Sequence, residues 1–276
     1  TQPPGTAPGG GSGAGRGRAA VRAVGEILIT LGLVVLLFVV YELYVTNLMS
    51  AQLQREASAE LEQRWSRERE VDAAPIEGEA FARIRIPSFG VDWGFTVQQG
   101  VDAETLETGP GHYPDSAMPG EPGNVAVAGH RVGKGAPFND LDLLESCDPV
   151  VIETAKHFFV YRVLPLADEV EGWSSGRGAD PRCADVRPLA THHEGYADTV
   201  GRVIVLPHRG DAVAPVPYRQ AGAVPEEARV PLLTLTTCHP RFSDRERMII
   251  HSVLTHRYEK GPDASYERLL SEIGEM

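Results

Sequence analysis

The pattern of apolar and polar positions divides the chain into three regions. An unbroken apolar run covers residues 27–41, a helical pattern continues to about residue 72, and short apolar runs separated by Gly and Pro begin near residue 81. Residues 1–25 precede the apolar run, are rich in Gly, Pro, Ala and Ser, and contain no acidic residue. Such a composition cannot bury a core and predicts a disordered segment over 1–25.

The apolar run predicts an uncleaved membrane anchor. It is short for a span of about 20 residues, but its apolar flanks extend it to 26–46. A buried core helix would have a polar face, which this run lacks, and the following residues form no convincing signal-peptide cleavage site. Because Arg16, Arg18 and Arg22 precede the run, we expect a single-pass protein of the cell membrane with a cytoplasmic N-terminus and the rest of the chain outside the cell.

A helix is predicted over residues 47–72. Its less polar positions, Leu53, Ala57, Leu61 and Trp65, recur every four residues between Glu, Gln and Arg. We interpret residues 47–77 as a helical linker, a solvated spacer rather than an oligomerisation helix.

The third region, residues 78–258, has the sequence pattern of an all-β sandwich or barrel. Val, Ile, Leu and Phe dominate its apolar runs, and little helix separates them. We expect short helices near 103–106 and 139–144, and a terminal helix over 264–273 within an acidic tail, residues 259–276. The predicted strands cover residues 81–86, 94–98, 124–128, 149–154, 158–164, 201–206, 230–236 and 247–254.

Charge and cysteine content narrow the functional classes. The net charge of −12 over 276 residues argues against a nucleic-acid partner, which would need clustered Lys and Arg. Three cysteines in an exported protein suggest one pair and one free thiol. The chain begins with Thr, which is typical of a processed product or a fragment.

Two apolar strands end in residues that can carry out acyl transfer. Residues 230–238 run directly into Cys238, and the next strand begins at Arg247, so an antiparallel hairpin would bring the two together. A thiolate attacks carbonyl carbon, and a guanidinium can donate hydrogen bonds to the resulting oxyanion. Residues 123–130 form another apolar strand that ends in His130, a side chain that exchanges protons near neutral pH. Each residue alone has a structural explanation, but the combination predicts a nucleophile, a proton-transfer partner and a transition-state stabiliser.

These motifs resemble those of the sortase family. Thr234-Leu235-Thr236-Thr237-Cys238 with Arg247 nine positions later is similar to the TLxTC…R signature, and Ala128-Gly129-His130 is similar to the family's histidine segment. The segments 109–121 and 237–247 look most like class E sortases of actinobacteria. The resemblance implies an eight-stranded sortase-like β-barrel, without a cofactor, that follows the transmembrane helix.

The resemblance also implies an activity. A cysteine transpeptidase of this kind cleaves a C-terminal LPxTG-type or LAxTG-type sorting signal between Thr and Gly. It then joins the secreted protein to an amine of a cell-wall peptidoglycan precursor such as lipid II. Tyr113, Thr236 and Thr237 are candidate contacts for the sorting signal.

Other residues and functions remain as alternatives. Cys147 and Cys183 lie outside the motif and are a candidate disulfide. His192 and His193 lack a third ligand at metal-site spacing, so we predict no metal. A pilin-polymerising sortase is a second hypothesis, although its usual Asp-Pro-Trp lid motif does not occur near the linker. A papain-like hydrolase has the opposite order of Cys and His. A non-catalytic barrel that binds wall peptides would have an unreactive Cys238.

Overall fold

The computed structural model describes all residues except 1–12, 68–74, 192, 262–263 and 276. Contacts within the chain define two units, Thr1–Val45 and Thr46–Met276. The first unit contains helix α1, Gly13–Val40, and a π-helical turn, Tyr41–Val45. Within it, Gly17–Val40 has a mean hydropathy of 2.7 and is long and apolar enough to cross a membrane.

Helix α1 begins earlier than the sequence analysis predicts. The disorder predicted over residues 1–25 is wrong for 13–25, which are helical, whereas residues 1–12 lie outside the described residues. The reason is local: Ala, Arg and Val dominate residues 18–24 and favour a helix, whereas Gly and Pro are concentrated before them.

The second unit starts with helix α2, Thr46–Arg67, which packs on the barrel. Leu61 is 1% exposed, and the side-chain amide of Gln54 bonds to both the N–H and the hydroxyl of Thr96 through Oε1, at 2.9 Å each. The interpretation of a solvated spacer is therefore wrong. The helix docks largely through polar side chains, which a count of apolar positions does not detect.

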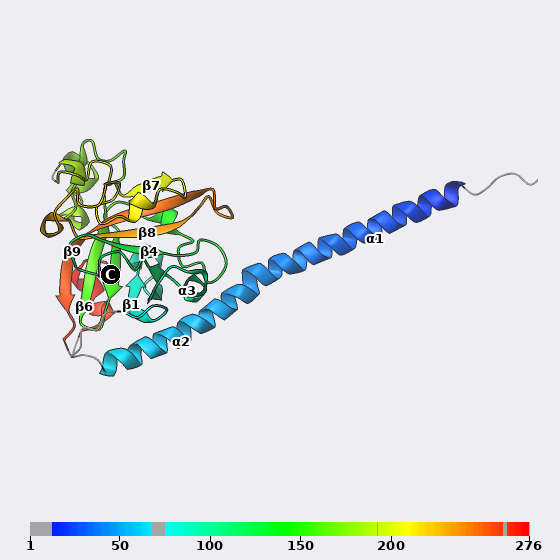
Figure 1. Cartoon of the computed structure of the whole chain (residues 1–276), viewed down its shortest axis with the longest axis horizontal. Helices are drawn as coiled ribbons and strands as arrows, with labels where there is room; N and C mark the ends of the chain where they lie inside the picture. Colours follow the sequence, from blue (N-terminus) through cyan, green and yellow to red (C-terminus); the bar gives the residue numbers. More distant parts are fainter. Residues whose placement is uncertain (1–12, 68–74, 192, 262–263, 276) are drawn as a thin grey trace, which may run out of the picture. The chain divides into compact units, whose positions relative to one another are not determined.

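Eight strands form a closed barrel, as predicted (Figure 1). They are hydrogen-bonded in the order β6-β5-β1-β2-β3-β4-β8-β9, and pairing of β6 with β9 closes the ring. A ninth strand, β7, pairs with the first part of β9. The strands are β1 Ala80–Arg85, β2 Gly94–Gln99, β3 Gly111–His112, β4 Asn124–Ala128, β5 Pro149–Glu153, β6 His157–Val163, β7 Arg202–Val205, β8 Leu232–His239 and β9 Glu246–Glu259.

Side chains alternate between the two faces of the strands that carry the candidate site. Leu233 and Leu235 of β8 belong to the barrel core, together with Met248 and Ile250 of β9. Intervening positions of β8 therefore point to the outer face of the barrel. Two long connections, residues 164–201 and 206–231, bring a second apolar cluster, which includes Tyr196 and Val216, against Leu232.

The short helices occupy the predicted places. Helix α3, Ala103–Thr108, begins at Asp102, whose carboxylate accepts hydrogen bonds from the N–H groups of Glu104 and Thr105. A single 3₁₀ turn, Leu141–Leu143, lies within the second predicted helix.

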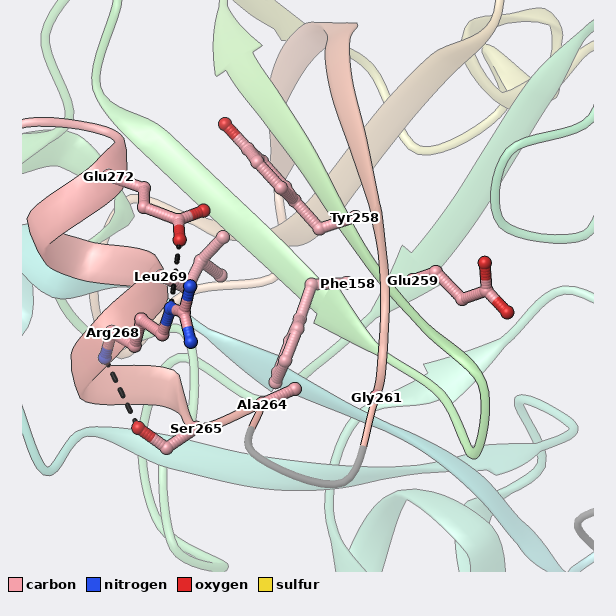
Figure 2. Close-up of a pocket in the computed structure, with 9 residues that line it drawn as sticks. All are labelled: Phe158, Tyr258, Glu259, Gly261, Ala264, Ser265, Arg268, Leu269 and Glu272. Atoms are coloured by element: carbon pink, nitrogen blue, oxygen red, sulfur yellow. Dashed lines mark hydrogen bonds and ion pairs between the residues drawn. The ribbon is translucent and has the colours of Figure 1, made fainter.

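Helix α4, Tyr266–Glu272, shows that the acidic tail is part of the packed domain. Tyr266, Leu269 and Leu270 are buried against Phe158 and Val160 of β6. Figure 2 shows the small pocket at this contact, where Leu269 of the helix lies near Phe158, and Arg268 pairs with Glu272 at 3.1 Å. The pocket lies by the last residues of β9, whereas Arg247 stands at the start of that strand.

Candidate active site

Cys238 and Arg247 are directly paired in the β8–β9 ladder. Opposed residues of an antiparallel pair project to the same face, so the sulfur and the guanidinium share the outer face of the barrel. Both side chains are partly exposed, and Cys238 is a free thiol. Arg245, two residues earlier, is exposed and precedes β9, so the register favours Arg247 as the neighbour of the cysteine.

His130 leaves β4 beside the end of β8 that carries Cys238. The strands are parallel, with Ala128 opposite Thr236. The pairing continues past β4, because the Gly129 N–H donates to the Thr236 carbonyl at 3.1 Å and the Thr237 hydroxyl donates to the Gly129 carbonyl at 2.8 Å. A Cβ at Gly129 would lie 2.6 Å from the Phe138 ring, so only glycine fits before the histidine.

The surroundings of His130 favour its neutral form. Burial lowers the pKa of His130, nearby Lys134 lowers it further, and Glu107 opposes both effects. Its Nε2 atom is buried and has no hydrogen-bond partner among the residues that the structure describes. A buried polar atom without a partner is costly, and a hydrogen bond to a substrate or to the thiol would satisfy it.

The Arg247 guanidinium is oriented by the turn between β8 and β9. Its Nη1 donates to the carbonyls of Asp244 at 2.8 Å and Glu246 at 3.0 Å. Both bonds use one nitrogen of a group that has five N–H donors. A free thiol, an imidazole and a hydrogen-bonded guanidinium at one edge of a sheet are a combination that can carry out acyl transfer.

The sequence analysis missed Arg131, which links the histidine loop to the cysteine strand. Its side chain is 3% exposed and pairs with Asp142 at 3.0 Å. Its Nη1 also donates to Nδ1 of His239 at 2.8 Å and to the Cys238 carbonyl at 3.4 Å. Only its position directly after His130 could have indicated this role from the sequence, because an arginine in a loop is normally interpreted as a surface charge.

The three candidate substrate contacts fall into two groups. Thr236 lies two residues before Cys238 on the outer face, and the Tyr113 hydroxyl is 3.3 Å from its hydroxyl oxygen. Tyr113 and Thr236 thus lie on the face of the sheet that also carries Cys238. Thr237 faces the barrel interior, is 2% exposed, and bonds to Gly129. This geometry suits a residue that holds β4 against β8.

A buried polar chain lies deeper on the same face. The Thr234 hydroxyl donates to Asn124 Oδ1 at 2.7 Å and therefore accepts from Nδ1 of His251 at 2.8 Å. Nε2 of His251 then accepts from the Tyr218 hydroxyl at 2.9 Å. Full burial lowers the pKa of His251 to about 3. The chain fixes the 206–231 connection, which carries Tyr218, to the face of the sheet.

A disulfide fixes the other long connection. Cys147 and Cys183 are bonded, with Cα atoms 5.2 Å apart. The bridge is buried with Trp173 and Val186 and ties residues 164–201 to the start of β5.

The residues considered as metal ligands form no such site in the described part of the chain. No group of three or more His, Cys, Asp or Glu side chains suited to a metal occurs among the described residues. His192 itself lies outside them.

The fold and the site are those of an eight-stranded barrel with Cys, His and Arg side chains at one edge. Residues 84–255, more than half of the chain, match the model of the Sortase domain. The chain therefore belongs to the sortase family, and the predicted resemblance is confirmed.

Known proteins support this assignment. The chain is 29% identical over 255 residues to Sortase SrtE1 of Streptomyces coelicolor and 31% identical over 168 residues to Sortase SrtE2 of the same organism. These alignments cover 89% and 56% of this chain, but only 61% and 66% of the relatives. The solved SrtF sortase from Corynebacterium diphtheriae is 39% identical, with a TM-score of 0.60 over 71% of this chain and 94% of that one. The predicted likeness to class E is confirmed by the two Streptomyces relatives.

Proposed function

We propose that this chain is a membrane-anchored cysteine transpeptidase. It cleaves the C-terminal sorting signal of a secreted substrate protein and transfers that substrate to a cell-wall amine. The observation that carries the proposal is the strand register. Cys238 stands directly opposite Arg247, and His130 follows β4 at the same end of the sheet.

The proposed reaction has two steps. The Cys238 sulfur attacks the Thr carbonyl of the Thr–Gly bond, and Arg247 donates hydrogen bonds to the oxyanion. His130 takes the proton of the Cys238 thiol during this attack and gives it to the leaving Gly amine, so that a thioester remains on the enzyme. An incoming amine then attacks the thioester, His130 takes the proton from that amine, and the sulfur leaves as a thiolate to which His130 returns the proton. The half-buried position of His130 suits both transfers, because burial brings its pKa below the ordinary value and keeps a neutral base available.

The surface beside the sulfur supports a peptide substrate. Tyr113 and Thr236 place two hydroxyl groups 3.3 Å apart on the outer face, which also carries Cys238. We propose that they contact a signal of the LAxTG or LPxTG type in an extended conformation. The resemblance to class E sortases favours LAxTG, and it implies no cofactor.

The apolar helix supports a single-pass location. Gly17–Val40 can span a membrane, and Arg18 and Arg22 lie near its start. By the positive-inside rule we propose a cytoplasmic N-terminus and an extracytoplasmic barrel. Secreted proteins that carry sorting signals and a peptidoglycan precursor of the lipid II type would then be the partners on that side.

Product analysis by mass spectrometry tests this function. The full chain in detergent is incubated with LAxTG and LPxTG peptides and an amine acceptor. We expect a product cut after Thr and joined to the amine, and no product from Cys238→Ala. Full activity of Cys238→Ala would refute the assignment. Transfer to a lysine of a pilin subunit, but not to a peptidoglycan-type amine, would identify a pilin-polymerising enzyme instead.

A further inference from the structure

The loop that follows His130 has an unusual backbone. Gly133, Lys134, Gly135 and Ala136 have φ angles of 67°, 49°, 77° and 39°. Positive φ is unfavourable for residues with a side chain, so Lys134 and Ala136 store local strain. Such a conformation persists only where neighbouring structure holds it.

Helix α2 supplies part of that support. Asn47 Oδ1 accepts a hydrogen bond from the Gly135 N–H at 3.0 Å, and the Thr46 hydroxyl oxygen lies 3.5 Å from the Lys134 nitrogen. Ser50, one turn further along, is 3% exposed, and its Cβ would lie 3.4 Å from a Cβ built at Gly135. The first turn of α2 therefore docks on the two central residues of the loop.

The same loop determines the electrostatic environment of His130. The loop runs from His130 to Phe138, and the Phe138 N–H donates to the His130 carbonyl at 3.0 Å. Lys134 pairs with Glu107 of α3 at 2.7 Å, and these two charges act on His130 in opposite directions. A displacement of the loop would change both the solvation of the imidazole and its distance from these charges.

We propose that the first turn of α2 positions His130 for proton transfer, with Asn47 as the positioning residue. The inference rests on the proposed function and adds a part of the chain that the sortase signature does not include. Asn47 acts through the Gly135 N–H and does not itself touch the reacting atoms. Because Thr46 directly follows Tyr41–Val45 in the chain, the segment next to the apolar helix becomes part of the machinery that sets proton transfer.

A merely structural contact makes a different prediction from a positioning contact. If Asn47 only holds the helix in place, Asn47→Ala lowers the melting temperature and leaves the pH dependence unchanged. If it positions His130, Asn47→Ala lets water reach the imidazole. The pKa of His130 then rises towards its ordinary value, since burial is the main cause of its depression.

The experiment compares three variants of the full chain in detergent. Asn47→Ala removes the acceptor, Asn47→Asp keeps an acceptor oxygen for Gly135, and Gln52→Ala is the control. Gln52 is exposed on the same helix, where its side chain bonds to Glu56 at 2.9 Å. For each variant kcat and KM are measured with the sorting peptide against pH. The rate of Cys238 alkylation by iodoacetamide is measured over the same pH range.

For Asn47→Ala we expect kcat to fall about 3- to 10-fold and KM to change less than about 2-fold. The histidine-dependent step in both pH profiles should move upward by about half a pH unit. Asn47→Asp should restore kcat, because it keeps the acceptor for the Gly135 N–H, and Gln52→Ala should match the parent. An Asn47→Ala variant with the parental kcat and pH profiles, or one whose defect Asn47→Asp leaves in place, would overturn the proposal.

The two readouts separate this inference from the proposed function. If the protein is not a transpeptidase, neither the parent nor any variant forms product. The alkylation profile of Cys238 still reports the environment of its histidine neighbour. A shift of that profile in Asn47→Ala would support the positioning role, and its absence would refute it.

Discussion

Two histidines near the candidate site have opposite environments: His251 lies on β9, and His130 lies just after β4. His251 is fully buried, both its ring nitrogens are hydrogen-bonded, and its pKa is lowered to about 3. His130 is half-buried, and its Nε2 has no partner in the described part of the chain. Buried polar groups with all their hydrogen bonds made, such as His251, stabilise the packing on this face of the sheet. A group with an unmade hydrogen bond at the edge of the face, such as His130, is a candidate for catalysis.

The largest expected effect on activity comes from a substitution at the edge of the barrel where Cys238, His130 and Arg247 lie. Removing the sulfur with Cys238→Ala should reduce transpeptidation by more than about 10³-fold, because covalent catalysis is lost. The melting temperature should change little, since the residue is partly exposed. Peptide turnover measures the loss of activity, and thermal unfolding measures the melting temperature. A variant that unfolds as well as losing activity would contradict a purely catalytic role for Cys238.

Arg247→Lys should reduce kcat by about 10²-fold, because an ammonium cannot reproduce the planar donor set of a guanidinium. The KM for the peptide should change much less. Arg245→Lys is the matched control on the same turn and should retain parental kinetics. If the two variants exchange these behaviours, Arg245 rather than Arg247 stabilises the oxyanion.

The two long connections offer a further comparison, because one is fixed by a disulfide and the other by the polar chain. Replacing Cys147 and Cys183 by Ser opens a loop with a sequence separation of 36 residues. Loop entropy predicts a loss of roughly 3–4 kcal/mol in the free energy of unfolding. Urea unfolding of the purified double variant measures it. An unchanged midpoint would mean that the bridge adds nothing to the stability of the 164–201 connection.

His251→Leu should cost roughly 1–3 kcal/mol in the free energy of unfolding, because Thr234 and Tyr218 lose a buried partner. His130→Leu should cost less stability but abolish turnover. Urea unfolding at pH 7 and peptide assays on both variants test the comparison. A larger loss of stability in His130→Leu than in His251→Leu would contradict the comparison.

The pH dependence of stability should also separate the two histidines. His251 takes up a proton near pH 6.5 when unfolded but only near pH 3 when folded. The unfolded state therefore binds more protons below pH 6.5, and stability falls as the pH drops, by about 1.4 kcal/mol per pH unit. The stability advantage of the parent over His251→Leu should thus shrink by roughly 2–3 kcal/mol between pH 6.5 and pH 4.5. A constant difference would mean that His251 can be protonated in the folded state.

The sequence predicted the barrel because its strands carry dense apolar runs that Gly and Pro separate. The one strand missed, β3, has two residues and no periodicity, and its His112 is buried by tertiary contacts, including a bond to Gln99 at 2.8 Å. The docking of α2 was missed for a related reason. Gln54 and Asn47 make its contacts, and polar residues on a helix are normally read as solvated.

The candidate site shows the same division. A cysteine at a strand end and an arginine at the next strand start could be paired from the sequence, because a hairpin leaves few registers. The supporting contacts could not. Arg131 of the loop after His130 donates to His239 at the end of β8. His251 accepts from Tyr218, which lies in the irregular 206–231 connection. Such contacts depend on tertiary packing, which no local pattern encodes.

The central claim is that Cys238 is a nucleophile served by His130 and Arg247. The most direct test is the intact mass of the full chain after incubation with a LAxTG-type peptide whose Thr–Gly bond is replaced by a thiol-reactive group. We expect one peptide adduct on Cys238, formed at least about 10-fold more slowly in His130→Ala and Arg247→Ala. No adduct, or an adduct that forms equally fast in both variants, would contradict the account.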